Sequence, residues 1–223
     1  MKKMNLSNVT LRVLSALVML MLVGCAVMAH MRFPSIHIIR WIGVAIVIGA
    51  IVETVRCFIN ARLNVLRKKW PYFVAFSILL LLMLISVYFV GMKPWIILWL
   101  LMVIAGADIG GWLFGMIFGG DKMWERLSAK KTWAGQIGGI ICGTLMSVLF
   151  FYYFGPFVND NLFAVLFGVT ISLLSQYGDL TASYVKRCLG IKDFGKILPG
   201  HGGILDRFDG WIYVLPFIWF FIK

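Results

Sequence analysis

The sequence predicts an all-α protein: a polytopic membrane helical bundle of about six to seven transmembrane helices with a polar site facing the cytoplasm. Hydrophobic residues make up 61% of the 223 residues, whereas soluble domains contain about 45–50% apolar residues. The apolar residues form runs of about 20, the length at which a helix crosses the hydrocarbon core. Such runs are too long for barrel strands, and a helix satisfies its own backbone hydrogen bonds in lipid.

Six apolar runs are long enough to span the bilayer. They cover roughly Leu11–Met31, Ile36–Thr54, Pro71–Met92, Pro94–Phe118, Ala134–Gly155 and Asn161–Tyr177. A seventh run, Trp211–Ile222, would rise only about 18 Å as a helix, so it spans only with help from neighbouring helices or a thinned bilayer. No linker, low-complexity tract or repeat divides the sequence, and we expect a single domain over residues 1–223.

Basic residues are distributed unevenly between the two sides that these spans define. With the N-terminus inside, all of the 21 lysines and arginines except Arg32, Arg40, Lys93 and Lys223 fall on the cytoplasmic side. Because Lys and Arg collect in cytoplasmic loops, we expect a multi-pass protein of the cell (inner) membrane. The net charge of +12 suits anionic lipids and anionic ligands, and no nucleic acid partner is expected. The basic loop Arg56–Lys69 is one of three polar stretches, and its cluster Arg62–Lys69 is expected to serve topology alone.

The four cysteines, Cys25, Cys57, Cys142 and Cys188, lack metal-ligand spacing, so packing roles are expected. The segment ending at Cys25 also resembles a lipoprotein signal, but the apolar run continues beyond it, which favours an uncleaved span.

Glycines recur at four-residue spacing in two neighbouring spans. They are Gly111, Gly115 and Gly119 in the first and Gly135, Gly139 and Gly143 in the second. Such faces let helices approach closely, so we expect packing rather than ligand contact. The same faces would permit a homodimer.

Only nine acids occur in the chain, and five lie in or beside its polar stretches: Asp108, Asp179, Asp193, Asp206 and Asp209. If "ILDRFDG" is helical, Asp206 and Asp209 share one face and offer two hard oxygen donors to Mg²⁺. Asp108 lies deep within an apolar span, where an acid is costly and functional by default. Glu53 is closer to the end of its span and is expected at the membrane interface.

Two polar stretches contain side chains suited to phosphate. In the stretch Gly178–Gly210, four polar residues fall along one stripe of a helix: Asp179, Ser183, Lys186 and Arg187. In "PGHGG", the glycines let backbone N–H groups approach an anion, and His201 would either bind a phosphate or hold the loop. In the stretch Gly120–Gly135, "SAKKT" at Ser128–Thr132 places two lysines and two hydroxyls at a helix start. These groups would form a phosphate-binding site or a cytoplasmic anchor.

The residues from Ser183 to Asp209 resemble the signature of the phosphatidate cytidylyltransferase family, also called CDP-diacylglycerol synthase. The spacing agrees throughout as S-x-x-K-R-x(4)-K-D-x(5)-P-x-H-G-G-x-x-D-R-x-D. Weaker similarity extends upstream through "GDL" at Gly178, "KKTWAG" at Lys130 and the "GADIGGWLFG" segment that contains Asp108.

The resemblance implies Mg²⁺-dependent transfer of a cytidylyl group from CTP to phosphatidic acid in the membrane, giving CDP-diacylglycerol and pyrophosphate for phospholipid biosynthesis. The metal ligands implied are Asp179, Asp206 and Asp209. The catalytic residues implied are Asp206, Asp179, Lys186, Arg207 and His201. The substrate-binding residues implied are Ser128, Lys130, Lys131, Thr132, Ser183, Arg187, Lys192 and Asp108.

Two alternatives stay open. A CTP-dependent transferase acting on another lipid phosphate, such as a polyprenyl phosphate, would carry the same signature, which describes the nucleotide and metal half better than the acyl half. A non-catalytic relative that binds nucleotide or lipid, or a transporter of anionic solutes, is favoured by departures from the family pattern. Ala134 replaces a usual acid and Met116 replaces a frequent arginine. Ala129, in place of a usual proline, is a further departure. The intact acids of the signature oppose this second alternative.

Overall fold

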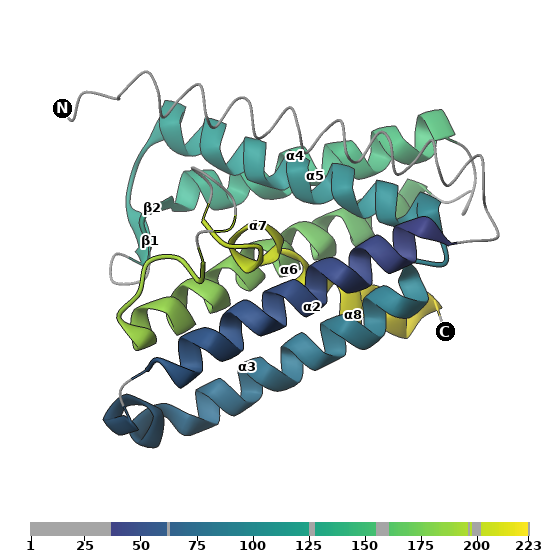
Figure 1. Cartoon of the computed structure of the whole chain (residues 1–223). Helices are drawn as coiled ribbons and strands as arrows, with labels where there is room; N and C mark the ends of the chain where they lie inside the picture. The colour runs from purple at the N-terminus through teal and green to yellow at the C-terminus, as the bar shows by residue number, and fades with distance from the viewer. Residues whose placement is uncertain are drawn as a thin grey trace. The chain divides into compact units, whose positions relative to one another are not determined.

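The computed structural model describes residues 37–61, 63–124, 128–154, 161–195, 197 and 202–222 (Figure 1). These residues fall into two compact units: a first unit of residues 37–94 and 185–208, and a second unit of Trp95–Tyr184 and Asp209–Phe221. The single-domain organisation stays a prediction. The predicted span Leu11–Met31, with Cys25, lies outside the described residues.

The described part of the chain contains five helices that are long and apolar enough to cross a membrane. They are α2 (Ile38–Ile59), α3 (Leu63–Val90), α4 (Pro94–Phe118), α5 (Trp133–Phe154) and α6 (Asn161–Leu189). Two shorter helices follow, α7 (Leu205–Phe208) and α8 (Trp211–Ile222). The predicted all-α membrane fold is therefore confirmed. The span predicted at Pro94–Phe118 has the bounds of α4, whereas α6 continues beyond the predicted end at Tyr177 to Leu189.

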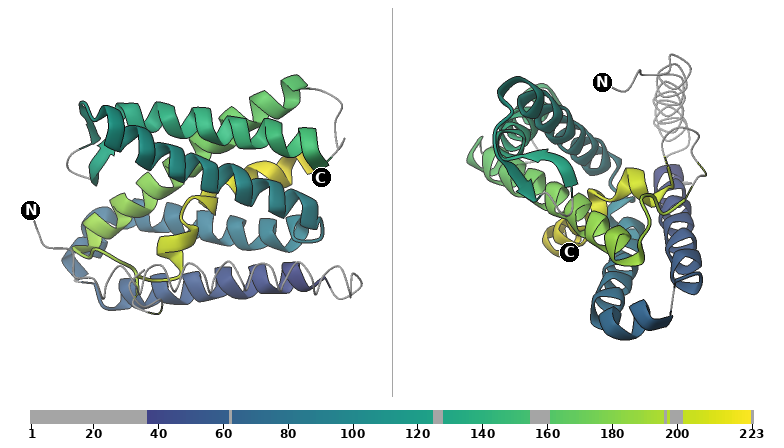
Figure 2. Two further views of the ribbon diagram at one scale, coloured as in Figure 1. Left: turned by 90° about the horizontal axis from the view of Figure 1, so that it is seen from above. Right: turned by 90° about the vertical axis from the view of Figure 1, so that its left-hand side faces the viewer.

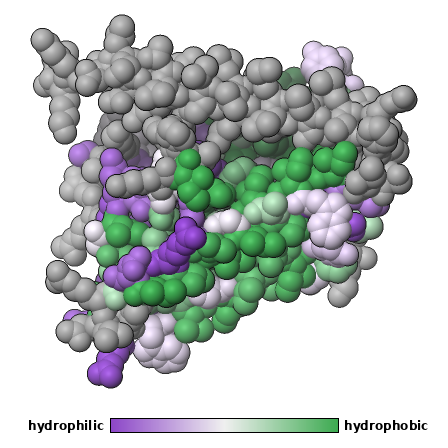
Figure 3. Space-filling view, viewed as in Figure 1, coloured by the Kyte–Doolittle hydropathy of each residue, from purple (hydrophilic) through white to green (hydrophobic). Residues whose placement is uncertain are grey.

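In the first unit, α2 and α3 lie side by side (Figures 1 and 2). They approach closely at Gly43, where a Cβ atom would lie 2.7 Å from Val87 Cγ2. Only a short turn joins them, so the predicted basic loop Arg56–Lys69 is wrong as a loop. Its first four residues end α2 and its residues from Leu63 onward begin α3. The helix α3 bends at Lys69 because the ring of Pro71 interrupts the regular hydrogen-bonding pattern. The surface over α2 and α3 is mostly apolar (Figure 3), as expected for helices in lipid.

In the second unit, α4 and α5 pack against each other through their glycines. A Cβ atom on Gly135 would lie 2.7 Å from the Gly111 carbonyl oxygen, and one on Gly139 would lie 2.8 Å from the Ala107 carbonyl oxygen. Gly119 takes no part, because it lies beyond α4 with a φ of 57° and has no neighbour within 4 Å. The packing role is confirmed for Gly111, Gly115, Gly135, Gly139 and Gly143. These glycines pack within one chain, so they no longer argue for a homodimer.

A short antiparallel hairpin, β1 (Lys122–Trp124) and β2 (Ser128–Thr132), precedes α5. "SAKKT" leads directly into α5 and so stands at a helix start as predicted, but its residues form a strand, which the sequence did not predict. The Oγ1 of Thr132 accepts a hydrogen bond from the Gly135 N–H at 3.1 Å, which is the geometry of a helix N-cap. Residues before an N-cap lie outside the helix, and here their backbone groups pair with β1.

Candidate active site

The polar C-terminal end of α6 closes with a turn that reverses the chain. Gly190 adopts a left-handed φ of 72°, and the Ile191 N–H donates to the Lys186 carbonyl oxygen at 3.0 Å. This is the Schellman pattern, in which glycine ends a helix at low conformational cost. The reversal returns Phe194 to the same unit as Lys186, with its side chain buried.

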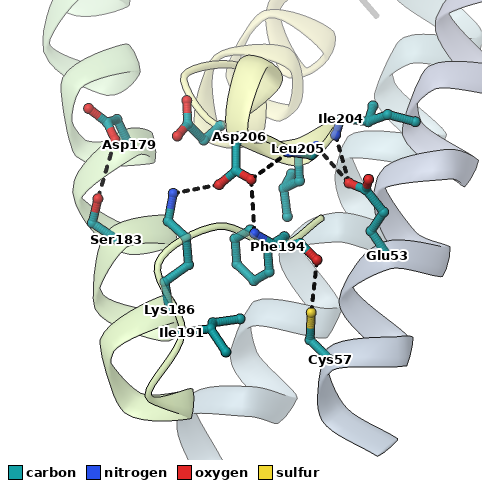
Figure 4. A network of polar contacts seen from close by, with 12 residues as sticks. Glu53, Cys57, Asp179, Ser183, Lys186, Ile191, Phe194, Ile204, Leu205 and Asp206 are labelled. Carbon is teal, nitrogen blue, oxygen red and sulfur yellow. Dashed lines mark hydrogen bonds and ion pairs between the residues drawn. The ribbon is translucent and has the colours of Figure 1, made fainter. Parts of the chain in front are cut away.

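The carboxylate of Asp206, in the first turn of α7, accepts three hydrogen bonds within the first unit (Figure 4). Its Oδ1 accepts from Lys186 Nζ at 2.7 Å, and its Oδ2 accepts from the N–H groups of Phe194 and Gly203 at 2.9 Å each. The side chains of Lys186 and Asp206 are only 10% and 4% exposed. Charge-assisted bonds of this kind are short and strong, so the position of the Asp206 carboxylate is tightly fixed.

Lys186 is buried against an aromatic ring as well as against an acid. Its Nζ lies 5.4 Å from the ring centroid of Phe194, within the range of a cation–π contact. The Phe194 ring in turn stacks on Phe76 of α3, with 6.0 Å between centroids. A buried lysine needs such partners, because an isolated charge in this setting is costly.

Glu53 of α2 contacts the backbone at the start of α7 (Figure 4). Its Oε2 accepts from the N–H groups of Ile204 at 2.7 Å and Leu205 at 3.3 Å. The residue is 4% exposed, so it is buried within the protein, and its expected place at the membrane interface stays a prediction. The first N–H groups of a helix have no intrahelical partner, and Glu53 provides one in a buried setting. An acid within an apolar run was the sequence signal that could have indicated such a role.

A second group of predicted site residues meets within the second unit. Lys131 Nζ lies 2.6 Å from Asp179 Oδ2, with the side chains 25% and 40% exposed. The Ser183 hydroxyl donates to Asp179 Oδ1 at 3.4 Å. Lys131 comes from β2 and the other two residues from α6, so the hairpin positions a basic group over the acid.

Asp209 belongs to a turn between α7 and α8 rather than to a helix. Its Oδ1 accepts the Gly210 N–H at 2.9 Å, and its carbonyl oxygen accepts the Ile212 N–H at 3.3 Å. Because α7 ends at Phe208, the prediction that Asp206 and Asp209 share a helical face is wrong. The Asp209 backbone packs instead against Gly178, the residue before Asp179, where a Cβ atom would collide with it.

Comparison with known proteins identifies the family. The model of the Cytidylyltransferase family matches residues 2–223. The chain belongs to this family. Phosphatidate cytidylyltransferases of Staphylococcus aureus (strain COL) and Staphylococcus haemolyticus are 44% and 42% identical over 124 and 125 residues. That of Staphylococcus epidermidis is 40% identical over 122 residues. Each alignment covers 55% of this chain and 46% of the relative, so the chain spans about half the length of the curated relatives it matches.

The remaining predicted residues of this cytidylyltransferase-family chain lie mostly at exposed positions. Arg187 Nη1 donates to the Ile191 carbonyl oxygen at 3.3 Å, so it stabilises the end of α6. Ser128 is half-buried on β2. Exposed side chains are those of Asp108, Lys192, Asp193 and Arg207. His201 and the side chain of Lys130 lie outside the described residues.

The described part of the glycine-rich loop binds the protein's own carboxylates. The Gly203 N–H donates to Asp206, although the sequence predicted that these N–H groups would face a bound anion. Gly202 has a φ of 88°, and a Cβ atom there would lie 3.1 Å from Asp206 Oδ2 and 3.4 Å from Asp193 Cβ. Glycine is therefore needed at this position both for the backbone conformation and for the space beside the acid.

Among the residues that the structure describes, no group of three or more His, Cys, Asp or Glu side chains is arranged to hold a metal ion. Asp206 and Asp179, both predicted ligands, are each paired with a lysine. Their chemistry still fits Mg²⁺, because carboxylate oxygens are the protein ligands it prefers. The lysines neutralise charge that a divalent cation would otherwise neutralise.

Proposed function

We propose that this member of the Cytidylyltransferase family transfers a cytidylyl group from CTP to phosphatidic acid, giving CDP-diacylglycerol and pyrophosphate. Family membership over residues 2–223 and relatives named phosphatidate cytidylyltransferase support this reaction. The observation that carries the proposal is the Asp206 carboxylate, held at fixed geometry by Lys186 and two backbone N–H groups inside the signature.

The proposed reaction is an in-line displacement at the α-phosphorus of CTP. An oxygen of phosphatidate forms the new bond, the bond between the α-phosphorus and the bridging oxygen breaks, and pyrophosphate leaves with its electron pair. The attacking oxygen is already anionic and needs little help from a general base, so catalysis depends on positioning and on neutralising charge. When bound, Mg²⁺ would supply charge neutralisation at the phosphates.

The chain's own residues would hold the substrates. We assign Asp179, Asp206 and Asp209 as ligands for Mg²⁺. Lys186, which already balances one of these acids, would hold a phosphate oxygen. The remaining proposed contacts to CTP or phosphatidate come from Ser128, Lys130, Lys131, Thr132, Ser183, Arg187, Lys192, His201, Arg207 and Asp108.

The membrane supplies the lipid substrate. The protein is a multi-pass membrane protein with five candidate spans among its described residues. We place its active site on the cytoplasmic side of the cell (inner) membrane, because lysine and arginine predominate on the side that would be cytoplasmic. The proposed reaction does not require a homodimer.

The test is formation of CDP-diacylglycerol by purified protein in detergent, from labelled CTP and phosphatidic acid, with and without Mg²⁺. Asp206→Asn should abolish turnover, whereas Asp121→Asn, at an exposed acid just before β1, should not. Polyprenyl phosphate tested in parallel identifies the acceptor. If the folded wild-type protein binds CTP but forms no CDP-diacylglycerol, the proposal is wrong.

A further inference from the structure

Glu53 is an acid inside an apolar membrane-spanning helix, which is a costly place for a charge. It lies 151 residues before Ile204, its hydrogen-bond partner, and outside the signature. None of the residues assigned above to CTP, lipid or metal includes it. Burying its carboxylate costs free energy, so its contacts should show a role that offsets this cost.

Glu53 and Asp206 divide three consecutive backbone N–H groups between them. The Gly203 N–H donates to Asp206, and those of Ile204 and Leu205 donate to Glu53. The next residue along the chain is Asp206 itself. Glu53 therefore fixes the backbone from which the Asp206 side chain projects.

The space around the Glu53 carboxylate is filled by two glycines. A Cβ atom on Gly203 would lie 2.6 Å from Glu53 Oε2 and 2.7 Å from the Gly195 nitrogen. A Cβ atom on Gly195 would collide with Glu53 Oε1. That oxygen is buried and has no hydrogen-bond partner among the described residues. Any larger residue at these two positions would push the carboxylate away from the N–H groups that it accepts.

Three residues of α2, each one turn apart, contact the connection between α6 and α7, and Figure 4 shows two of them, Glu53 and Cys57. A Cβ atom on Gly49 would lie 2.8 Å from Ile204 Cδ1. Glu53 binds two N–H groups as described, and Cys57 Sγ donates to the Phe194 carbonyl oxygen at 3.0 Å. Spacing of four residues places all three on one face of the helix.

We infer that this face of α2 holds the connection in place and that Glu53 is a positioning residue for Asp206. The inference rests on the proposed function, in which Asp206 is central to the reaction. Displacement of a reacting group by about 1 Å can cost about 100-fold in rate. Loss of Glu53 should therefore lower kcat, even though Glu53 does not touch the substrates.

The test compares Glu53→Leu, which removes both acceptor interactions, with Glu53→Gln, which keeps an acceptor oxygen. Glu53→Leu should lower kcat by about 100-fold and change the KM values for CTP and phosphatidate by less than about threefold. Glu53→Gln should stay within about tenfold of wild-type kcat. Thr54→Val is the matched control, because Thr54 is equally buried but its hydroxyl donates only within α2.

Hydrogen exchange of the amides at residues 203–205 tests the inference without the reaction. These amides should exchange faster in Glu53→Leu and at the wild-type rate in Thr54→Val. Wild-type kcat and unchanged exchange in Glu53→Leu would overturn the inference. If wild-type protein forms no product, the proposed function fails, and the exchange rates alone decide whether Glu53 positions the connection.

Glu53→Asp decides the question if Glu53→Leu does not fold. This variant keeps the charge but withdraws the carboxylate by one methylene, so it cannot reach both N–H groups as glutamate does. Its kcat should fall by about tenfold or more with a Tm close to that of the wild type. Wild-type kcat in this variant would contradict the positioning role.

Discussion

The Nζ atom of Lys186 lies 2.7 Å from Oδ1 of Asp206, and both side chains are almost fully buried. Each charge is a salt-bridge partner of the other. Taking either partner away leaves an uncompensated charge in a buried setting, which costs more than the pair itself contributes. The two residues should therefore behave as a single energetic unit.

Single substitutions in this pair should each destabilise the protein, by about 3–5 kcal/mol for Lys186→Met. Asp206→Asn should cost less, because its amide oxygen still accepts hydrogen bonds. The double variant should lose less than the sum of the two single losses, since no unpaired charge remains. Chemical unfolding of all four proteins in the same detergent measures this coupling. Additive losses would show that the pair is not coupled.

The Lys131–Asp179 pair should respond differently, because its side chains are 25% and 40% exposed. Lys131→Met should lower the unfolding free energy by at most about 1 kcal/mol. If Lys131 holds a phosphate as proposed, the same change should lower kcat/KM for CTP by about 100-fold. Lys122→Met, at an exposed lysine of the paired strand, is the control. It should change neither the unfolding free energy nor kcat/KM for CTP. Equal kinetics in the two variants would remove Lys131 from the proposed site.

Two facing glycines should differ in their tolerance of a methyl group. In Gly135→Ala the new Cβ would lie 2.7 Å from the Gly111 carbonyl oxygen, so α4 and α5 must separate. A loss of about 1–3 kcal/mol is expected. In Gly111→Ala the Cβ would make an ordinary contact at 3.4 Å, and the better helix propensity of alanine should leave stability unchanged or raise it by about 1 kcal/mol. Thermal unfolding in detergent compares the stabilities of the two variants. A Gly111→Ala variant less stable than Gly135→Ala would contradict this packing.

Hydropathy predicted the spans well because lipid imposes a simple rule on long apolar runs. The same measure ended the last long span at Tyr177, although α6 continues to Leu189. Apolar residues report contact with lipid, and a helix that leaves the lipid loses that signal without losing its hydrogen bonds. The hairpin at Ser128–Thr132 was missed because its strands are short and their pairing depends on a partner segment.

The sequence predicted which residues belong to the candidate site, but not all of the contacts between them. The signature spacing identified Lys186 and Asp206, and the structure pairs them. It gave no information on Glu53, because a contact across 151 residues leaves no local pattern. The helical face expected for Asp206 and Asp209 is absent because α7 ends at Phe208 and Asp209 lies in the turn before α8, where its side chain accepts the Gly210 N–H.

The length of α6 has a consequence for where the two substrates of the proposed reaction could meet. A helix of 29 residues measures about 43 Å, while the hydrocarbon core is about 30 Å thick. About two and a half turns must therefore extend past the acyl chains unless the helix tilts strongly. The last three turns carry Asp179, Ser183 and Lys186. If this excess length lies at the C-terminal end of α6, these groups would lie near headgroup depth, where the nucleotide of the proposed reaction could reach a lipid phosphate without the lipid leaving its leaflet.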